Sequence, residues 1–331
     1  MNMIEVQNLT KDYGNNRGIF HLNFSIKQGE TVAFLGTNGA GKTTTIRQLM
    51  GFVKPQNGIA KINGLDCFQQ EEVIQKQVGY LSGEIAFLDE NMTGQDFIKF
   101  MSDIKKIENH QRIKQLITYF ELDTQIKIKK MSKGTKQKIG LIVAFMQDAP
   151  VLILDEPTSG LDPIMQNKFI ELIMKEKSNG KTIIMSSHIF EEVEHTCDRI
   201  LCIKDGKLIA DENVEDIKCN RSKQYSITFS KEQDALNFAK KYSDVSLINS
   251  RTALLMLTGS INDLLHELYN YDVTDIDVRN QTLEELFLQY YGGNENVYEQ
   301  RDKWLADFVS HVPPAKQDDI RQLIKENTEI I

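Results

Sequence analysis

Eight residues near the N-terminus, GTNGAGKT from Gly36 to Thr43, have the types and spacing needed to bind phosphate. They fit the pattern G-x-x-x-x-G-K-[ST]. The apolar run ETVAFLG leads into them and TTTIRQLMGF follows with apolar residues at helical spacing, so we expect a strand, a glycine-rich turn and a helix N-terminus. Backbone N–H groups and the positive end of the helix dipole then surround one small volume that suits an oligo-anion. The segment predicts binding of a nucleoside triphosphate.

Within this loop, two side chains have expected roles of their own. Lys42 can reach the β- and γ-phosphates as a point charge, and the Thr43 hydroxyl can bind Mg²⁺. The glycines allow the backbone to turn sharply and to approach phosphate oxygens closely. The residues expected to contact the nucleotide are Gly36, Thr37, Asn38, Gly39, Ala40, Gly41, Lys42, Thr43 and Thr44.

A second motif, VLILDEP at 151–157, supplies carboxylates. Four apolar residues predict a buried strand, with Asp155 at its C-terminal end facing the metal ion. Glu156 is placed to orient an attacking water or accept its proton. His188 follows the strand pattern KTIIMSS, at the edge where active-site loops gather in open parallel sheets. Lys42, Glu156 and His188 are therefore the expected catalytic residues of a hydrolase.

The bulk properties narrow the class of protein. A length of 331 residues favours two structural units. No apolar stretch reaches the roughly 18–20 residues that cross a bilayer, and the N-terminus lacks the pattern of a secretion signal. A net charge of −8 argues against a dominant nucleic-acid-binding face. The four cysteines show no paired metal spacing, which is typical of free thiols in a cytosolic protein.

Strand and helix signals alternate through the first two thirds of the chain, beginning with an expected edge strand in residues 1–12. A helical insert is expected at about 93–149, opened by a capping pattern at Thr93–Asp96. Strand signals return at 151–156, 181–187 and 199–209. This alternation predicts a three-layer α/β core with a mostly parallel sheet and antiparallel edge strands.

The pattern changes after about Asn213. The order β-α-β-β-α-β over 220–292 predicts a small ferredoxin-like α+β domain. A last helix, TLEELFLQYY, starts with the capping box Thr282-x-x-Glu285 and ends at Gly292-Gly293. The tail at 293–331 contains two amphipathic helical patterns. We therefore expect a first domain at 1–215, an accessory domain at 220–292 and a helical tail.

These motifs together resemble the ATP-binding subunit of an ABC transporter, over about residues 3–215. The resemblance implies the family's P-loop NTPase fold, with ATP and Mg²⁺ as cofactors. The motifs that carry it are Walker A (GTNGAGKT), Walker B (VLILDE), the D-loop (SGLD, 159–162), the switch histidine (His188) and the adenine-stacking aromatic (Tyr13).

The sequence departs from the family in two places. MSKGTKQKIGL (131–141) occupies the place of the family's signature motif LSGGQ. Ser132 and Gly134 are kept, whereas Lys133 replaces a glycine and Thr135 replaces the glutamine. In the family this segment binds the γ-phosphate across a head-to-tail dimer, and Lys133 or Lys136 could add positive charge. For Lys136 the alternative is that it is only a solvated charge at the start of a helix. In the loop GYLSGE (79–84), Gly83 stands where the family has glutamine. We predict that Glu84 replaces it as a Mg²⁺ ligand; the alternative is that water fills the place.

Three further features resemble ABC-2-type exporters of drugs, lantibiotics or peptides: the SKG signature, the GYLSGE loop and the small α/β extension that ends in TLEELFLQYY. The resemblance implies a separate transmembrane permease, a homodimer or a heterodimer with a paralogous ATPase, and a place on the cytoplasmic face of the membrane, with no nucleic-acid partner. An alternative is a soluble ABC ATPase acting on nucleic acid or ribosomes, which the single Walker A motif and the unpaired cysteines disfavour. A module that binds ATP without hydrolysing it is a third reading, disfavoured by Glu156 and His188.

Overall fold

The structure is a computed structural model that describes residues 1–85, 87–187, 189–219, 223–241, 245–257, 260–280 and 282–283. It divides into two compact units, Met1–Asp216 and Ile217–Ile331. Three sequence predictions fall outside the described residues: the position of His188, the last helix beyond Leu283, and the tail at 293–331.

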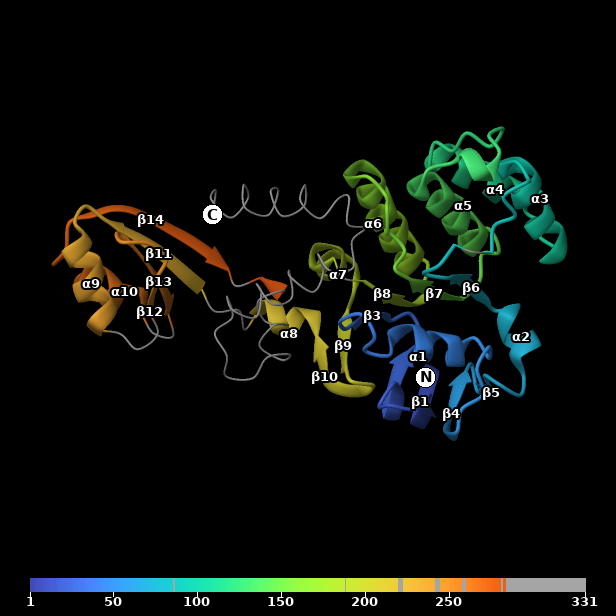
Figure 1. Ribbon diagram of the computed structural model, residues 1–331, viewed down its shortest axis with the longest axis horizontal. Coiled ribbons are helices and arrows are strands. Elements are labelled where there is room, and N and C mark those ends of the chain that lie inside the picture. The colour runs from blue at the N-terminus through green and yellow to red at the C-terminus, as the bar shows by residue number, and fades with distance from the viewer. Residues whose placement is uncertain are drawn as a thin grey trace. The chain divides into compact units, whose positions relative to one another are not determined.

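A six-stranded, mostly parallel sheet forms the centre of the first unit (Figure 1). Its strand order is β10-β9-β3-β8-β7-β6, and only the edge strand β10 runs antiparallel to its neighbour. The strands are β3 (Thr31–Leu35), β6 (Val78–Leu81), β7 (Val151–Asp155), β8 (Thr182–Ser186), β9 (Arg199–Lys204) and β10 (Lys207–Asn213). The single strand signal at 199–209 is in fact a hairpin, because Asp205 and Gly206 both take positive φ and reverse the chain.

A second sheet of the first unit is antiparallel, with the order β2-β1-β4-β5. Its strands are β1 (Asn2–Asp12), β2 (Gly18–Lys27), β4 (Asn57–Ile62) and β5 (Leu65–Asp66). The expectation of an edge strand at 1–12 is wrong, since β1 pairs with both β2 and β4. Alternating side chains report which face is buried, but not whether the backbone pairs on one side or on both.

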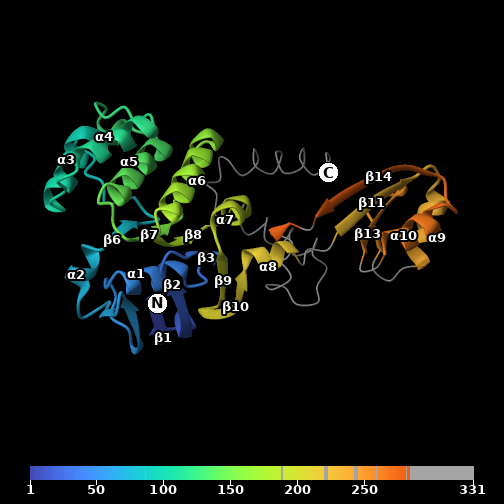
Figure 2. The ribbon, with the colours of Figure 1, turned by 180° about the vertical axis from the view of Figure 1, so that it is seen from behind.

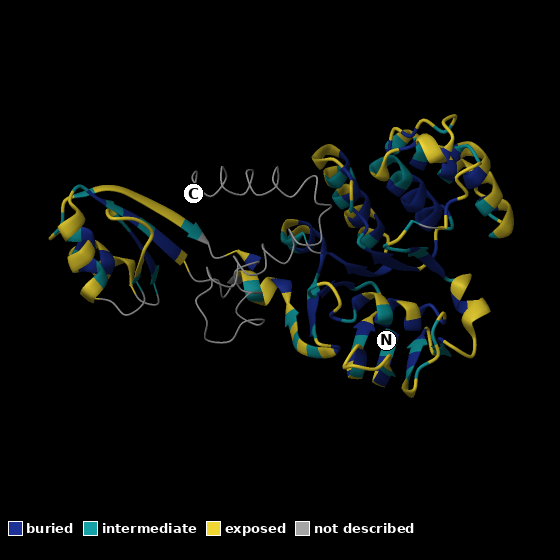
Figure 3. Cartoon of the chain, in the orientation of Figure 1, coloured by how far each residue is buried: buried dark blue, intermediate teal, exposed yellow. Residues whose placement is uncertain are grey.

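Helices fill the space between these sheets and cover the parallel sheet. Helix α1 (Lys42–Leu49) lies between the two sheets and contacts β2, β4 and β7 (Figures 1 and 2). Buried residues of both sheets and of α1 form one hydrophobic core. The opposite face carries α5 (Lys133–Phe145), α6 (Pro163–Ser178) and α7 (Phe190–Thr196), which leaves the strands buried on both sides (Figure 3). The short helix α2 (Glu71–Gln75) precedes β6.

The segment between β6 and β7 is helical. It contains α3 (Gly94–Ile104), α4 (His110–Tyr119), a 3₁₀ turn at Ile128–Lys130 and α5. Thr93 caps α3 by accepting a hydrogen bond from the Asp96 N–H at 3.2 Å. A buried ionic network fixes this insert to the core, since Glu176 of α6 lies 2.8 Å from Arg112 of α4 and 2.5 Å from Lys181.

The second unit has its own antiparallel sheet and its own core. The sheet order is β12-β13-β11-β14, and the aromatic side chains of Phe229, Phe238 and Tyr271 pack against one another beneath it. In chain order its elements are β11 (Lys223–Phe229), α9 (Glu232–Lys241), β12 (Val245–Leu247), β13 (Thr252–Leu257), α10 (Ile261–Leu268) and β14 (Val273–Asn280); α8 (Val214–Cys219) precedes them.

Candidate active site

The loop between β3 and α1 is held in a tight conformation by its neighbours. A Cβ at Gly36 would lie 2.6 Å from the Ile203 carbonyl oxygen, so the close approach of β9 requires glycine there. Gly41 precedes α1 with a φ of 114°, and a Cβ on it would lie 2.7 Å from Ile19 Cγ2. The loop therefore presents the N-terminal N–H groups of α1 in a fixed geometry suited to phosphate oxygens.

Lys42 is almost fully buried at the base of this loop, with 7% exposure. Its Nζ donates to the carbonyl oxygens of Gly36 at 2.6 Å and Thr37 at 3.3 Å, and lies 3.9 Å from Glu156 Oε1. Burial lowers the pKa of Lys42, although the negative charges of Glu156 and Asp155 partly oppose the shift. Burial thus disfavours the ammonium ion, and a bound phosphate would add further negative charge beside it.

Thr43 and Asp155, both predicted as Mg²⁺ ligands, lie in direct contact. The Thr43 hydroxyl donates to Asp155 Oδ2 at 2.9 Å, and the Ser186 hydroxyl donates to Oδ1 at 2.5 Å. Asp155 and Ser186 are register partners at the ends of the parallel strands β7 and β8.

This pair of hard oxygens fits Mg²⁺. A hydroxyl and a carboxylate are ligands that Mg²⁺ accepts, and Mg²⁺ commonly keeps several waters and uses substrate phosphates rather than an all-protein cage. The described residues contain no group of three or more His, Cys, Asp or Glu side chains arranged around a metal position. Thr43 and Asp155 would hold the ion, which would neutralise phosphate charge.

Glu156 follows β7 directly and stands beside Lys42. Its side chain is 23% exposed, so water can reach the carboxylate. Its backbone has a φ of 49° and is held by bonds from its N–H to Ser186 Oγ at 2.9 Å and to Ser186 O at 3.2 Å. The backbone of Glu156 is therefore fixed with its carboxylate 3.9 Å from Lys42 Nζ, and the orientation of an attacking water by Glu156 stays a prediction.

Tyr13 lies in the turn between β1 and β2, with 55% exposure. Lys11 Nζ lies 5.6 Å from the centroid of its ring. The same turn ends at Gly18, whose carbonyl oxygen would lie 3.1 Å from a Cβ on Gly41 of the phosphate loop. An exposed aromatic ring on a turn that touches the phosphate loop suits stacking on a nucleobase, and adenine stacking stays a prediction for this residue.

Replacement of Tyr13 by alanine is expected to raise the KM for ATP about 10-fold, because base–aromatic stacking contributes about 1–3 kcal/mol. Stacking stabilises the ground state and the transition state alike, so kcat should change by less than about twofold. Steady-state kinetics on Tyr13→Ala and on the control Tyr13→Phe measure both constants. Equal KM values for the alanine variant and the wild type would show that Tyr13 does not stack.

Ser132 and Gly134, predicted to face a partner's nucleotide, begin helix α5. Ser132 caps the helix, its hydroxyl accepting from the Thr135 N–H at 3.2 Å. Gly134 packs so closely on the loop after Glu156 that a Cβ would lie 2.4 Å from the Gly160 carbonyl oxygen. The nearby Lys136 pairs with Glu90 at 2.8 Å. Contact of Ser132 and Gly134 with ATP of a second subunit stays a prediction.

Position 83 lies against the expected metal ligand. A Cβ on Gly83 would lie 3.2 Å from Cγ and Oδ2 of Asp155, so a side chain at this position would point at that carboxylate. The exposed Glu84 instead lines a pocket beside the loop. Its role as a substitute Mg²⁺ ligand stays a prediction.

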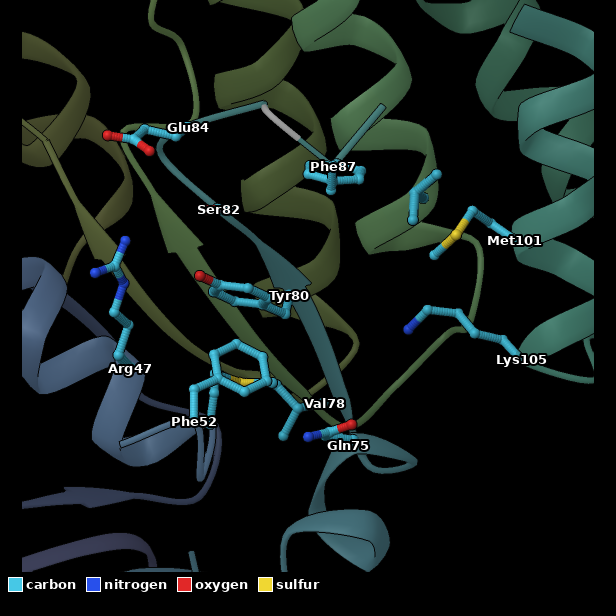
Figure 4. Close-up of a pocket in the computed structure, with 12 residues that line it drawn as sticks. Arg47, Phe52, Gln75, Val78, Tyr80, Ser82, Glu84, Phe87, Met101 and Lys105 are labelled. Carbon is cyan, nitrogen blue, oxygen red and sulfur yellow. The ribbon is translucent and has the colours of Figure 1, made fainter. Parts of the chain in front are cut away.

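That pocket, of about 500 Å³, lies between the core and the helical insert (Figure 4). The rings of Phe52 and Tyr80 meet edge to face on the core side, with centroids 5.5 Å apart. Lys105 lies on the insert side, where burial lowers its pKa and Gln147 accepts its hydrogen bond. The lining residues are Arg47, Met50, Phe52, Gln75, Val78, Tyr80, Ser82, Glu84, Phe87, Met101, Lys105 and Val143.

The structure thus brings together Lys42, Thr43, Asp155 and Glu156, whereas His188 lies outside the described residues and its role stays a prediction. The sequence analysis did not identify Ser186, whose hydroxyl donates to Asp155 Oδ1 and accepts from the Glu156 N–H. Its position at the end of the predicted strand, two residues before His188, was a signal that could have identified it. The buried Gln137 of α5 was likewise not identified.

No helix within the part of the chain described by the structure combines the length and the apolar character required to span a bilayer.

Comparison with known proteins finds a family model described as ABC transporter over residues 19–159. The chain is 32% identical to the bacitracin transport ATP-binding protein BcrA of Bacillus licheniformis, over 88% of this chain and 98% of that protein. It is 34% identical to the linearmycin resistance ATP-binding protein LnrL of Bacillus subtilis, over 63% and 68% of the two chains. Among solved structures, an ATP-binding subunit of an ABC transporter matches with a TM-score of 0.61 and 29% identity, covering 66% of this chain and 92% of the other.

Proposed function

This chain belongs to the ABC transporter family as an ATP-binding and ATP-hydrolysing subunit, and we propose that it powers export through a separate ABC-2-type membrane permease. The observation that supports this most strongly is the similarity to nearly the whole length of a bacitracin transport ATP-binding protein. The name of a second relative contains the word resistance, which agrees with removal of a compound from the cell. The proposed location is the cytoplasmic face of the membrane.

In the proposed cycle, two subunits assemble head to tail around ATP, either as a homodimer or with a paralogous ATPase. Lys42 and the N–H groups before α1 hold the phosphates, and Ser132 and Gly134 of the second subunit close on the γ-phosphate. Glu156 orients a water whose oxygen attacks the γ-phosphorus while the bond to the β–γ bridging oxygen breaks. The water proton passes to Glu156 or to phosphate, and His188 stabilises the γ-phosphate. Release of ADP and phosphate separates the subunits.

We propose the pocket between core and insert as the docking position for a cytoplasmic segment of the permease. Phe52 and Phe87 line it and are 51% and 40% exposed, which suits an apolar anchor on the partner. Arg47 and Lys105 add positive charge and favour an acidic residue beside that anchor. The pocket adjoins the loop that contains Gly83, and Gly83 lies against Asp155, so docking there is close to the hydrolysis site.

Purification of the tagged chain from solubilised membranes is expected to recover a polytopic membrane protein. Phe52→Glu places a charge in the pocket and should abolish this co-purification without changing the ATPase rate of the isolated subunit. Tyr269→Glu, at a 90% exposed residue of the second unit, is the matched control and should retain the partner. Recovery of the same membrane protein with the Phe52 variant would contradict docking in this pocket.

We further propose that the second unit is a ferredoxin-like accessory domain. Its chain order β-α-β-β-α-β and its sheet order β12-β13-β11-β14 support this assignment.

A further inference from the structure

Helix α5 contacts the segment that follows Asp155 through three of its residues. Gln137 Nε2 donates to the carbonyl oxygens of Glu156 at 3.2 Å and Pro157 at 2.7 Å. Lys133 Nζ donates to Ser159 Oγ at 2.9 Å. Gly134 contacts the Gly160 carbonyl, as described above. Residues 133 and 137 are four positions apart and therefore lie on one face of the helix.

The backbone of Glu156 needs such support. Its φ of 49° is a left-handed conformation that costs a residue with a Cβ about 1–2 kcal/mol. Strain of this kind persists only where the surroundings fix it, and it is often found at active sites. Here the N–H of Glu156 is tied to Ser186 at the end of β8, and its carbonyl oxygen is tied to Gln137 of α5. The N–H of Glu156 is therefore bonded to the core and its carbonyl oxygen to the helical insert.

The amide of Gln137 is used as a donor. The residue is 0% exposed, and its Oε1 has no hydrogen-bond partner among the described residues. An unpaired buried acceptor costs roughly 1–3 kcal/mol and offsets part of what the two donated bonds contribute to stability. The geometry therefore shows an amide that is used to donate to the backbone of Glu156 and Pro157.

We propose that Gln137 is a positioning residue for ATP hydrolysis, which transmits the orientation of the helical insert to the backbone of Glu156. The same helix begins with Ser132 and Gly134. A rotation of α5 that brings these residues onto a nucleotide would therefore also set the direction of the Glu156 carboxylate. This inference concerns hydrolysis itself and is independent of the permease and of the direction of transport.

The test compares Gln137→Met, which keeps the length of the side chain but removes the donor, with the wild type. We expect kcat to fall about 10-fold or more while KM and the Kd for ATP stay within about twofold, since only the positioning of the water is lost. The matched control is Gln224→Met, a buried glutamine of the second unit whose Oε1 also lacks a partner among the described residues. It should leave kcat unchanged.

A second variant, Gln137→Glu, separates donation from packing. A carboxylate cannot donate a hydrogen bond, but its protonated form can, and burial raises the pKa of such a group. The ratio of its kcat to the wild-type value should therefore rise as the pH is lowered from about 8.5 to about 6. The proposal would be overturned if Gln137→Met kept the wild-type kcat, or if its kcat fell only in proportion to the fraction of unfolded protein. It would also be overturned if the kcat ratio for Gln137→Glu did not depend on pH.

Discussion

Replacement of Glu156 by glutamine is expected to lower kcat for ATP hydrolysis by about 10²-fold or more while leaving ATP affinity nearly intact. Glutamine keeps the volume of the side chain but cannot accept a proton from the attacking water. Lys42 retains its bonds to Gly36 O and Thr37 O and remains available to phosphate. Because ATP holds the proposed dimer together, the variant should also accumulate as an ATP-bound dimer, which light scattering detects.

The matched control is Glu121→Gln, at an exposed glutamate that pairs with Lys168 on the surface. Surface ion pairs of this kind contribute little to stability, so this variant should fold normally and hydrolyse ATP at the wild-type rate. If Glu156→Gln turned over ATP as fast as the control, Glu156 would not be the residue that orients the water.

Replacement of Lys42 by alanine is expected to weaken ATP binding by about 10- to 100-fold and to abolish measurable hydrolysis. The estimate follows from the roughly 1.5–3 kcal/mol contributed by a hydrogen bond to a charged group. Nucleotide titration measures the affinity, and thermal unfolding checks that the variant is folded at the temperature of the titration. Wild-type affinity in this variant would exclude Lys42 from phosphate binding.

Much of the active site could be predicted because short-range chemistry fixes it. The glycine spacing and the apolar runs on both sides predicted the strand, the turn and the helix that hold Lys42 and Thr43. The strand ending at Asp155 was predicted for the same reason. The pairing of Thr43 with Asp155 then follows from a parallel sheet whose strands end at one edge.

The features that could not be predicted depend on backbone pairing and long-range packing. Nothing in the side chains of residues 2–12 distinguishes a strand paired on both sides from an edge strand. The contacts of Gln137 join residues 19 and 20 positions apart, and they depend on the left-handed backbone at Glu156. A glutamate after a strand carries no sequence signal for positive φ, which in most proteins favours glycine or asparagine.

The most direct test of the central claim is the rate of phosphate release by the purified chain together with its permease, measured against ATP concentration with and without Mg²⁺. The account predicts hydrolysis that requires Mg²⁺, that depends on ATP with a Hill coefficient above 1 because two nucleotides close one dimer, and that is lost in Glu156→Gln. Phosphate release that is absent in the wild type, or that persists without Mg²⁺ and in the Glu156 variant, would contradict it.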